Sequence, residues 1–206
     1  LPFRTGVSRY PDRMPRIIAG THRSRSLETI EGMSTRPYTD RVKESVFNIL
    51  QGHIEGANVL DLFAGIGTMG LEAVSRGAES VLMVERDRRV FAALERNIDT
   101  LGADDVATAV QGDALSTLPI LRAPRPLHVV FVDPPFAMMQ DDRTRERVFE
   151  QIQRLAELVD PDGFILLRTP LKHPRVDHTI EGLNGPEVRS YRKQHSVLFY
   201  TREQTA

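Results

Sequence analysis

The chain has 206 residues, of which 40% are hydrophobic, and its formal net charge at pH 7 is −1. That length and apolar content suit one compact α/β domain with a small appendage. The absence of cysteine excludes disulfides, a thiolate nucleophile and zinc held by cysteines. We see neither the ~20 consecutive apolar residues that a membrane span needs nor the apolar core of a signal peptide. We therefore expect a cytoplasmic protein.

Charge is distributed unevenly along the chain. Residues 1–50 have a net charge of +4, residues 51–167 of −8 and residues 168–206 of +3. Because contacts of lysine and arginine with phosphate dominate the affinity of proteins for nucleic acid, the two basic ends could hold a polyanion. The alternative is an ordinary solvated surface with an arginine-rich tail.

The N-terminal part of the chain predicts a leader and a small extension. Residues 1–13 contain many turn formers and show no period, so we expect a flexible leader. Residues 16–20 and 27–30 are short strand-like runs that could pair as a hairpin. We expect residues 14–52 to form this hairpin and one helix ahead of the main domain.

Four segments have the apolar spacing of amphipathic helices. The first follows Thr39 and Asp40, which are both of N-cap type, and it should cover residues 40–51. The other three helices are predicted over residues 67–76, 87–101 and 144–159.

Apolar runs bounded by turn residues predict the strands. Five runs are strongly apolar and two near the C-terminus are weaker candidates: residues 58–63, 80–85, 106–110, 128–133, 164–168, 188–191 and 196–200. Alternation of strands and helices is typical of a doubly wound, mostly parallel sheet. We expect residues 53–206 to form this α/β domain, with ligands at the carboxyl ends of its strands.

The first strand leads into a glycine-rich turn. Gly65, Gly67 and Gly70 match the pattern G-x-G-x-x-G between a strand and a helix, where glycine lets a ligand lie against bare backbone. Glu85, at the end of the next strand, could accept hydrogen bonds from both hydroxyls of a ribose. Asp61 would repel the pyrophosphate of a dinucleotide, but it suits the cationic amino-acid part of S-adenosylmethionine. A nicotinamide dinucleotide and a turn without any ligand are the alternatives.

Asp113 follows the third strand. In a doubly wound sheet it would lie at the same edge, where its carboxylate could accept a hydrogen bond from the adenine amino group of the cofactor. It could also cap a helix that begins after it, and the two roles are compatible. The expected cofactor-binding residues of the main domain are Asp61, Phe63, Ala64, Gly65, Gly67, Thr68, Glu85, Arg86, Asp113 and Ala114.

The fourth strand ends abruptly in Asp133-Pro134-Pro135-Phe136. Proline has no N–H and pushes the residue before it away from helical geometry, so this pair predicts a stiff, extended turn. Asp133 and the Pro134 carbonyl could accept hydrogen bonds from an exocyclic base amine and stabilise the positive charge that develops when a methyl group arrives. Phe136 could stack on the base, and no metal is required. The alternative is that the prolines only end the strand and Phe136 belongs to the core.

The Asp-Leu-Phe-Ala-Gly-Ile-Gly and Asp-Pro-Pro-Phe motifs resemble those of class I S-adenosylmethionine-dependent amino methyltransferases, which have a Rossmann-like fold. Residues 16–20 and 35–48 are similar to the RsmD-like family of small-subunit ribosomal RNA guanine-N2 methyltransferases, and the similarity runs from about Pro15 to Tyr200. The resemblance implies a flipped guanine as the substrate, at position 966 of 16S rRNA, within an assembled or assembling small subunit.

The resemblance also implies that the N-terminal extension is a lid over RNA and cofactor. Residues 36–43 would close over the cofactor, with Arg36 and Thr39 near its amino-acid end. The residues expected to contact RNA are Arg16, Arg23, Arg25, Arg41 and Lys43.

Three residues depart from the family pattern without removing a group that the reaction needs. Tyr38 and Phe136 stand where Thr and Tyr are expected, and His128 stands where Asp is common. A DNA adenine-N6 or protein glutamine methyltransferase could use the same Asp-Pro-Pro-Phe site, and a non-catalytic RNA-binding module would need only the basic residues. We expect a monomer. No metal is expected, because the six histidines show no close ligand spacing.

Overall fold

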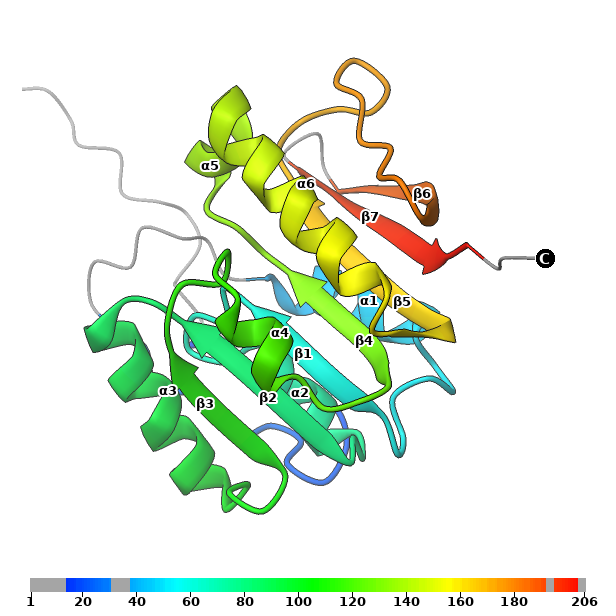
Figure 1. Cartoon of the computed structure of the whole chain (residues 1–206). Coiled ribbons are helices and arrows are strands. Elements are labelled where there is room, and N and C mark those ends of the chain that lie inside the picture. Colours follow the sequence, from blue (N-terminus) through cyan, green and yellow to red (C-terminus); the bar gives the residue numbers. More distant parts are fainter. Residues whose placement is uncertain (1–13, 31–37, 192–194, 204–206) are drawn as a thin grey trace, which may run out of the picture.

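The computed structural model describes residues 14–30, 38–191 and 195–203, and within these residues seven strands form one sheet (Figure 1). The strands are β1 (Asn58–Leu62), β2 (Ser80–Glu85), β3 (Ala107–Gln111), β4 (Leu127–Val132), β5 (Val159–Thr169), β6 (Leu183–Tyr191) and β7 (His195–Arg202). The helices are α1 (Asp40–Ile49), α2 (Gly70–Ser75), α3 (Arg88–Leu101), α4 (Leu118–Arg122), α5 (Phe136–Gln140) and α6 (Asp142–Ala156).

The strand order, β3-β2-β1-β4-β5-β7-β6, places the two sequence motifs side by side. β1 pairs in parallel with β2 on one side and with β4 on the other, and β4 pairs in parallel with β5. β7 is antiparallel to both β5 and β6. The prediction of a doubly wound, mostly parallel sheet is confirmed. Because the winding direction reverses between β1 and β4, the carboxyl ends of these two strands border the crevice in which such sheets bind ligands.

Alternate residues of the parallel strands face two apolar layers. In β1, Val59 packs with residues of α1, α2 and α3, whereas Leu60 and Leu62 pack with residues of α6. This is the two-residue period of a strand. Since both faces of the sheet are covered, the strands are almost continuously apolar. Among the residues that the structure describes, no helix is long and apolar enough to cross a membrane.

The N-terminal hairpin is present and shares the core of the sheet domain. Arg16 and Ser26 form an antiparallel bridge, and the Ile17 N–H donates to the Arg25 carbonyl at 2.9 Å. Ile17 and Leu27, on the two arms, are 0% and 1% exposed and belong to the apolar layer that also contains α1. A short hairpin with one bridge, at Arg16 and Ser26 rather than over residues 27–30, and the helix α1 therefore pack directly on the sheet domain.

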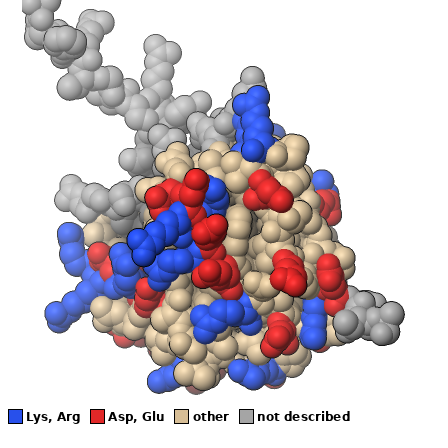
Figure 2. Space-filling view, turned by 45° about the horizontal axis from the view of Figure 1, so that its top comes forward, with Lys and Arg blue, Asp and Glu red and all other residues tan. Residues whose placement is uncertain are grey.

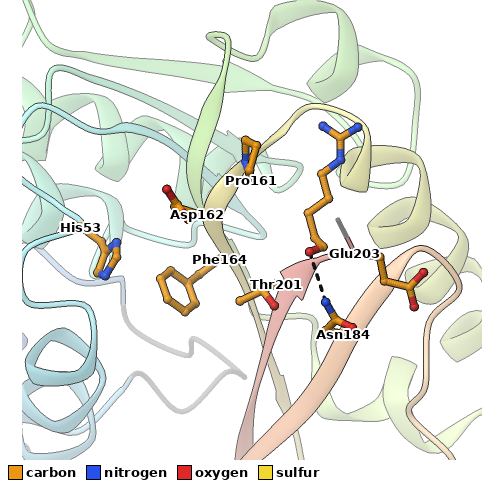
Figure 3. A pocket seen from close by; sticks show the side chains of 8 residues that line it. His53, Pro161, Asp162, Phe164, Asn184, Thr201 and Glu203 are labelled. Carbon is orange, nitrogen blue, oxygen red and sulfur yellow. Dashed lines mark hydrogen bonds between the residues drawn. The ribbon is translucent and has the colours of Figure 1, made fainter. Parts of the chain in front are cut away.

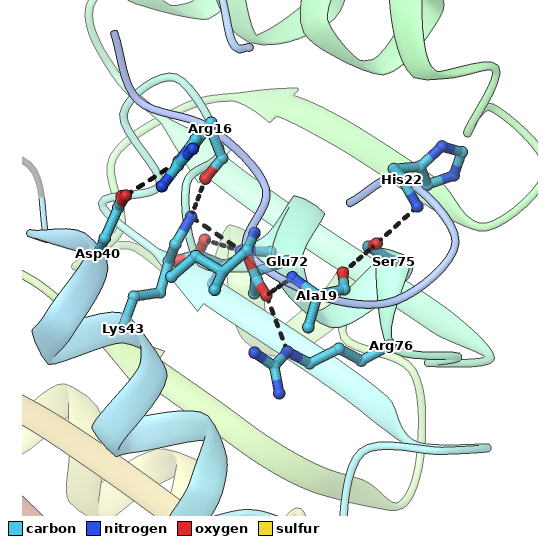
Figure 4. Close-up of polar contacts among 11 residues, drawn as sticks. Arg16, Ala19, His22, Asp40, Lys43, Glu72, Ser75 and Arg76 are labelled. Carbon is cyan, nitrogen blue, oxygen red and sulfur yellow. Dashed lines mark hydrogen bonds and ion pairs between the residues drawn. The ribbon is translucent and has the colours of Figure 1, made fainter. Parts of the chain in front are cut away.

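A buried carboxylate fastens the hairpin and α1 to α2 (Figure 4). Glu72 of α2 is fully buried, and it accepts hydrogen bonds from the backbone N–H groups of Ile18 at 2.8 Å and Ala19 at 3.1 Å. The same carboxylate pairs with the ammonium of Lys43 at 3.2 Å and with the guanidinium of Arg76 at 2.8 Å. Because a buried charge is tolerated only when it is paired and hydrogen-bonded, this cluster fixes the positions of the hairpin and α1.

Some helices differ from expectation for local reasons. α2 begins at Gly70 rather than at residue 67, because Gly65 and Gly67 have φ angles of +58° and +89°. Those are left-handed conformations, which an α-helix excludes. α4 and α5 were not predicted from sequence. Each has only five residues, which is too short to show a helical period.

Candidate active site

A cavity of about 1010 Å³ opens at the carboxyl ends of the parallel strands. Its wall combines the turn after β1, the end of β2, the segment after β3 and the segment after β4. The predicted catalytic and cofactor-binding residues on this wall are Thr39, Phe63, Ala64, Gly65, Thr68, Glu85, Arg86, Asp113, Ala114, Asp133, Pro134 and Phe136. The fold therefore brings the glycine turn and the Asp-Pro-Pro-Phe motif to one cavity.

The turn after β1 presents open backbone at Gly65. This residue has a φ of +58°, and a Cβ atom added to it would meet no atom within 4 Å. A positive φ favours glycine, and the missing side chain leaves room for a ligand to approach the backbone. The Gly65 N–H donates to Glu85 Oε2 at 3.0 Å, so the turn is fixed to the end of β2.

Two of the predicted cofactor contacts lie behind the cavity wall. Asp61 is 2% exposed, and its carboxylate accepts a hydrogen bond from the Gly70 N–H at 2.8 Å. Burial raises the pKa of Asp61 to about 8. A Cβ atom on Gly67 would lie 2.6 Å from the side chain of Leu94, so this glycine permits close packing of the turn on α3. Both residues shape the turn, and neither is among the residues that line the cavity; their contact with the cofactor stays a prediction.

Glu85 and Asp113 offer carboxylate oxygens to the cavity. Glu85 Oε1 accepts a hydrogen bond from the Asp87 N–H at 2.7 Å, in addition to the bond from the turn. Asp113 Oδ1 accepts from the Leu115 N–H at 2.9 Å. The expectation that Asp113 caps a helix is wrong, because the next helix, α4, begins at Leu118 and has Thr117 as its N-cap. A carboxylate has about four acceptor positions, so both side chains can accept further hydrogen bonds from a ligand.

Asp133 lies immediately after β4, beside the end of β1. Its backbone N–H donates to the Leu62 carbonyl at 3.3 Å, which holds the residue against the neighbouring strand. Pro135 has an extended backbone, with φ −49° and ψ 134°, and Phe136 begins the short helix α5. Burial raises the pKa of Asp133, and the positive charge of Arg168 acts in the opposite direction.

Arg168 was not predicted, yet its guanidinium lies in the middle of the site. It is 4% exposed, and Nη1 donates to Asp133 Oδ2 at 3.0 Å and to Oδ1 at 3.3 Å. The guanidinium carbon lies over the ring of Tyr38, 4.6 Å from its centroid, and over that of Phe136, 5.0 Å from its centroid. The guanidinium therefore touches the predicted acceptor and the predicted stacking residue at once.

Strand register explains the position of Arg168. Leu167 of β5 pairs with Val132, which is the last residue of β4. The residues that follow them, Arg168 and Asp133, are therefore neighbours at the carboxyl ends of the two strands. A charged residue near the end of a buried strand was visible in the sequence, but its partner depends on this register. His195 of β7 also lines the cavity, and burial together with the charge of Arg168 lowers its pKa to about 4.

Comparisons with known proteins agree with this geometry. The family model described as Conserved hypothetical protein 95 matches residues 15–200. The chain belongs to this family. Bacillus subtilis YlbH, provisionally named an rRNA methyltransferase, is 37% identical over 152 residues, which cover 73% of this chain and 80% of YlbH. Escherichia coli Ribosomal RNA small subunit methyltransferase D is 45% identical over 121 residues, which cover 59% of this chain and 60% of that protein.

A solved structure supports the same family. The Escherichia coli protein yhhF, provisionally described as a methyltransferase, has a TM-score of 0.75 and 33% identity, with 91% of this chain and 97% of yhhF covered. The fold of the Conserved hypothetical protein 95 family is thus that of class I methyltransferases. The resemblance to RsmD-like methyltransferases is confirmed by the family model and by the relatives.

The segment expected to close over the cofactor is described only in part. Thr39 caps α1, because its hydroxyl accepts a hydrogen bond from the Val42 N–H at 3.4 Å, and it lines the cavity. Asp40 is the first residue of the helix rather than its cap. Arg36 lies outside the residues that the structure describes.

Four of the five predicted RNA contacts are at the surface of this family member. Arg23, Arg25 and Arg41 are exposed. The side chain of Arg16 is 44% exposed and pairs with Asp40 at 3.0 Å. An exposed pair of this kind contributes little to stability, so Arg16 could exchange Asp40 for a phosphate.

Lys43 does not fit the role that we expected. It is 2% exposed, and its ammonium pairs with Glu72 and donates to the Arg16 carbonyl (Figure 4). An ammonium enclosed in this way has no access to a phosphate group. The prediction that Lys43 binds RNA is therefore wrong, and its role is to hold α1 in place.

Charges of both signs surround the active-site edge. Figure 2 shows acidic and basic side chains next to each other on the face that comes forward when the top of Figure 1 is tilted toward the viewer. On the cavity wall itself, Arg86 and Arg89 alternate with Glu85 and Asp87. This face is mixed rather than uniformly basic, so contacts with a polyanion would come from individual arginines.

A second hollow, of about 800 Å³, lies by the amino-terminal ends of β5 and β6 and the carboxyl end of β7 (Figure 3). The Asn184 side-chain amide donates to the Arg202 carbonyl at 3.3 Å beside it. Its wall is formed by His53, Pro161, Asp162, Phe164, Asn184, Thr201, Arg202 and Glu203. Since these include none of the residues that the sequence predicted for the site, the hollow is separate from the candidate active site.

Proposed function

We propose that this protein transfers a methyl group from S-adenosylmethionine to the N2 amine of guanine 966 in 16S rRNA. The observation that carries the proposal is the position of Asp133, on a cavity wall beside the glycine turn at the switch point of a class I methyltransferase fold. The name of the Escherichia coli relative, Ribosomal RNA small subunit methyltransferase D, supports small-subunit rRNA as the substrate class.

The residues on the cavity wall suit S-adenosylmethionine. Glu85 and Asp113 offer carboxylate oxygens to ribose hydroxyls and to an adenine amino group, and the backbone at Gly65 is open. Ile66 and Val84 add apolar surface for a planar ring. When bound, the cofactor would supply an electrophilic methyl group on a sulfonium centre.

Asp133 and Pro134 would prepare the amine for attack. The lone pair of an exocyclic amine is delocalised into the ring, so the amine is a weak nucleophile. Hydrogen bonds from the amine to the Asp133 carboxylate and the Pro134 carbonyl place negative charge where positive charge develops. Since burial raises the pKa of Asp133, its carboxylate is a stronger acceptor for the proton that the amine must lose.

Phe136 would hold the base in line with the methyl group. It lies on the cavity wall, on the first residue of α5 and close to Asp133 in sequence. A guanine must leave its stack to reach an enclosed site, and stacking on an aromatic ring compensates for part of that loss. Fixing the amine nitrogen near the methyl group removes much of the entropic barrier of a two-molecule reaction.

The proposal is tested by transfer of labelled methyl from S-adenosylmethionine to naked 16S rRNA, to 30S particles and to duplex DNA, followed by nucleoside analysis. We expect label in N2-methylguanosine from ribosomal substrates and none in DNA. Label in N6-methyladenosine from duplex DNA would instead establish the alternative DNA methyltransferase, and protein-bound label from 30S particles would indicate a glutamine methyltransferase.

A further inference from the structure

The guanidinium of Arg168 occupies the place where the proposed function puts the target base. It donates to both oxygens of Asp133, at 3.0 and 3.3 Å, and its central carbon lies over the rings of Tyr38 and Phe136, at 4.6 and 5.0 Å. We call this space, bounded by Asp133, Tyr38 and Phe136, the base slot. Tyr38 is 6% exposed and Arg168 is 4% exposed, whereas the side chain of Asp133 is 22% exposed, so the slot is buried on the Tyr38 side and open to the cavity at Asp133.

A guanidinium is charged and guanine is neutral, but both are planar, offer adjacent N–H donors and stack on aromatic rings. The arginine side chain is planar, offers a fork of N–H donors and stacks on aromatic faces. The edge of guanine that carries N1–H and the N2 amine is likewise planar, offers adjacent N–H donors and stacks on aromatic rings. Adenine and cytosine place a lone pair next to their amine, which a carboxylate would repel. A slot that holds a guanidinium against a carboxylate therefore suits guanine better than either.

Burial of Asp133 gives a reason for this arrangement. A carboxylate withdrawn from water is costly unless a cation or a set of hydrogen bonds compensates it. In the absence of substrate, Arg168 provides both. When a guanine amine takes over the hydrogen bonds to Asp133, the substrate instead of Arg168 compensates for the burial of the carboxylate.

We infer that Arg168 is an internal mimic of the target guanine, which fills the base slot of the free enzyme and is displaced from it by the substrate base. The inference rests on the proposed function. It makes Arg168 a positioning residue, because it keeps Asp133 and the two aromatic rings in the arrangement that a planar N–H donor requires. It also makes Arg168 a determinant of specificity, because a base enters only if it replaces the same contacts.

The inference is tested with Arg168→Ala and free methylguanidinium. The variant empties the slot, and methylguanidinium should fill it and inhibit methyl transfer to 30S particles competitively, raising the apparent KM for RNA without changing kcat. Wild-type enzyme already holds a tethered guanidinium at an effective concentration in the millimolar range. We therefore expect the inhibition constant of wild type to be about tenfold or more above that of the variant.

Two controls separate shape from charge and from misfolding. Methylammonium has the same charge without the planar fork, and it should not inhibit the variant. If Arg168→Ala does not fold, Arg168→Met, which keeps an aliphatic stem, takes its place. Methylguanidinium should also raise the Tm of the variant but not that of wild type, a measurement that needs no RNA.

Failure of the inference is distinguishable from failure of the proposed function. The inference would be overturned if methylguanidinium inhibited wild type and variant equally. It would also be overturned if methylguanidinium inhibited neither enzyme and left the Tm of the variant unchanged. In both cases methylation of guanine by wild type, and with it the proposed function, would stand. A Tm shift specific to the variant, in an enzyme that labels no ribosomal guanine, would support the slot and overturn the proposed substrate.

Discussion

Asp133 and Asp61 are both carboxylates in buried surroundings, and their neighbours give them different roles. Burial raises the pKa of each. In the free protein Arg168 lies 3.0 Å from Asp133 and favours its ionised form, which is the form that accepts N–H hydrogens. Asp61 instead accepts a hydrogen bond from the Gly70 N–H, and its pKa of about 8 leaves it largely protonated at neutral pH. We propose that Asp133 takes part in the chemistry, whereas Asp61 supports the shape of the turn.

Replacement of Asp133 should separate chemistry from cofactor binding. In Asp133→Ala the acceptor for the base amine is lost, and we expect kcat for methyl transfer to fall by about 100-fold or more. The residues proposed to hold the cofactor are untouched, so the Kd for S-adenosylmethionine, measured by calorimetry, should change little. Similar kcat values for the variant and wild type would refute the role of Asp133.

Asp61 should make the stability of the protein depend on pH. Its pKa in the folded state, about 8, lies above that in an unfolded chain. The stabilisation from its protonated form is full below the unfolded pKa and is lost as pH rises through about 8. Asp61→Asn keeps an acceptor for the Gly70 N–H but does not titrate. The Tm of this variant relative to that of wild type should therefore increase between pH ~5 and pH ~8, by about 2–4 °C for each kcal/mol of stability that wild type loses. A Tm difference independent of pH would contradict this account.

Among the elements, segments with a long, regular pattern are predictable from sequence. The central parallel strands are mostly apolar because both faces of the sheet are covered there. α3 and α6 combine an amphipathic pattern with the capping residues Asp87 and Asp141. α4 and α5 escape prediction because five residues cannot show a period.

The missed site residues depend on contacts between elements. Lys43 lies one helical turn before Phe47, so the spacing placed it on the buried face of α1, but its partner Glu72 belongs to α2. Arg168 ends an apolar run, but its partner Asp133 is set by the register of β4 and β5. In both cases the partner of the charged residue lies on another element, so the local sequence does not show it.

The buried cluster should contribute much more to stability than a surface ion pair in the same region. Lys43→Met removes the ammonium from the enclosed carboxylate of Glu72, and we expect the free energy of unfolding to fall by about 3 kcal/mol. Asp40→Asn, which breaks the exposed pair with Arg16, should cost less than about 1 kcal/mol. Denaturant unfolding of both variants measures the difference, and equal losses would show that the cluster does not anchor α1.

The hairpin should act on RNA through its exposed arginines. Replacement of Arg23 and Arg25 by glutamine should weaken binding of the RNA substrate and reduce the slope of log K against log salt by up to ~2. Arg122→Gln combined with Arg154→Gln, which changes two exposed arginines on the helices of the other sheet face, is the matched control. A slope that changes equally in both double variants would mean that the hairpin has no special contact with RNA.

At the scale of the whole molecule, one topological feature organises the site. The reversal of winding between β1 and β4 brings the glycine turn and Asp133 to one cavity, although many residues separate them in sequence. The N-terminal extension packs on the same sheet through Ile17, Leu27 and the Glu72 cluster. The tip of the hairpin is bound to Ser75, at the C-terminal end of α2, whereas α2 begins at Gly70 beside the glycine turn.

The central claim is methylation of one guanine by the Asp133 site, and mapping of the modified nucleotide tests it most directly. The measurement is the position and chemical identity of the methylated nucleoside after unmethylated 30S particles react with S-adenosylmethionine and the enzyme. The account predicts N2-methylguanosine at position 966 with the wild-type protein and no modification there with Asp133→Ala. Modification of another nucleotide by wild type, or of guanine 966 by the variant, would contradict it.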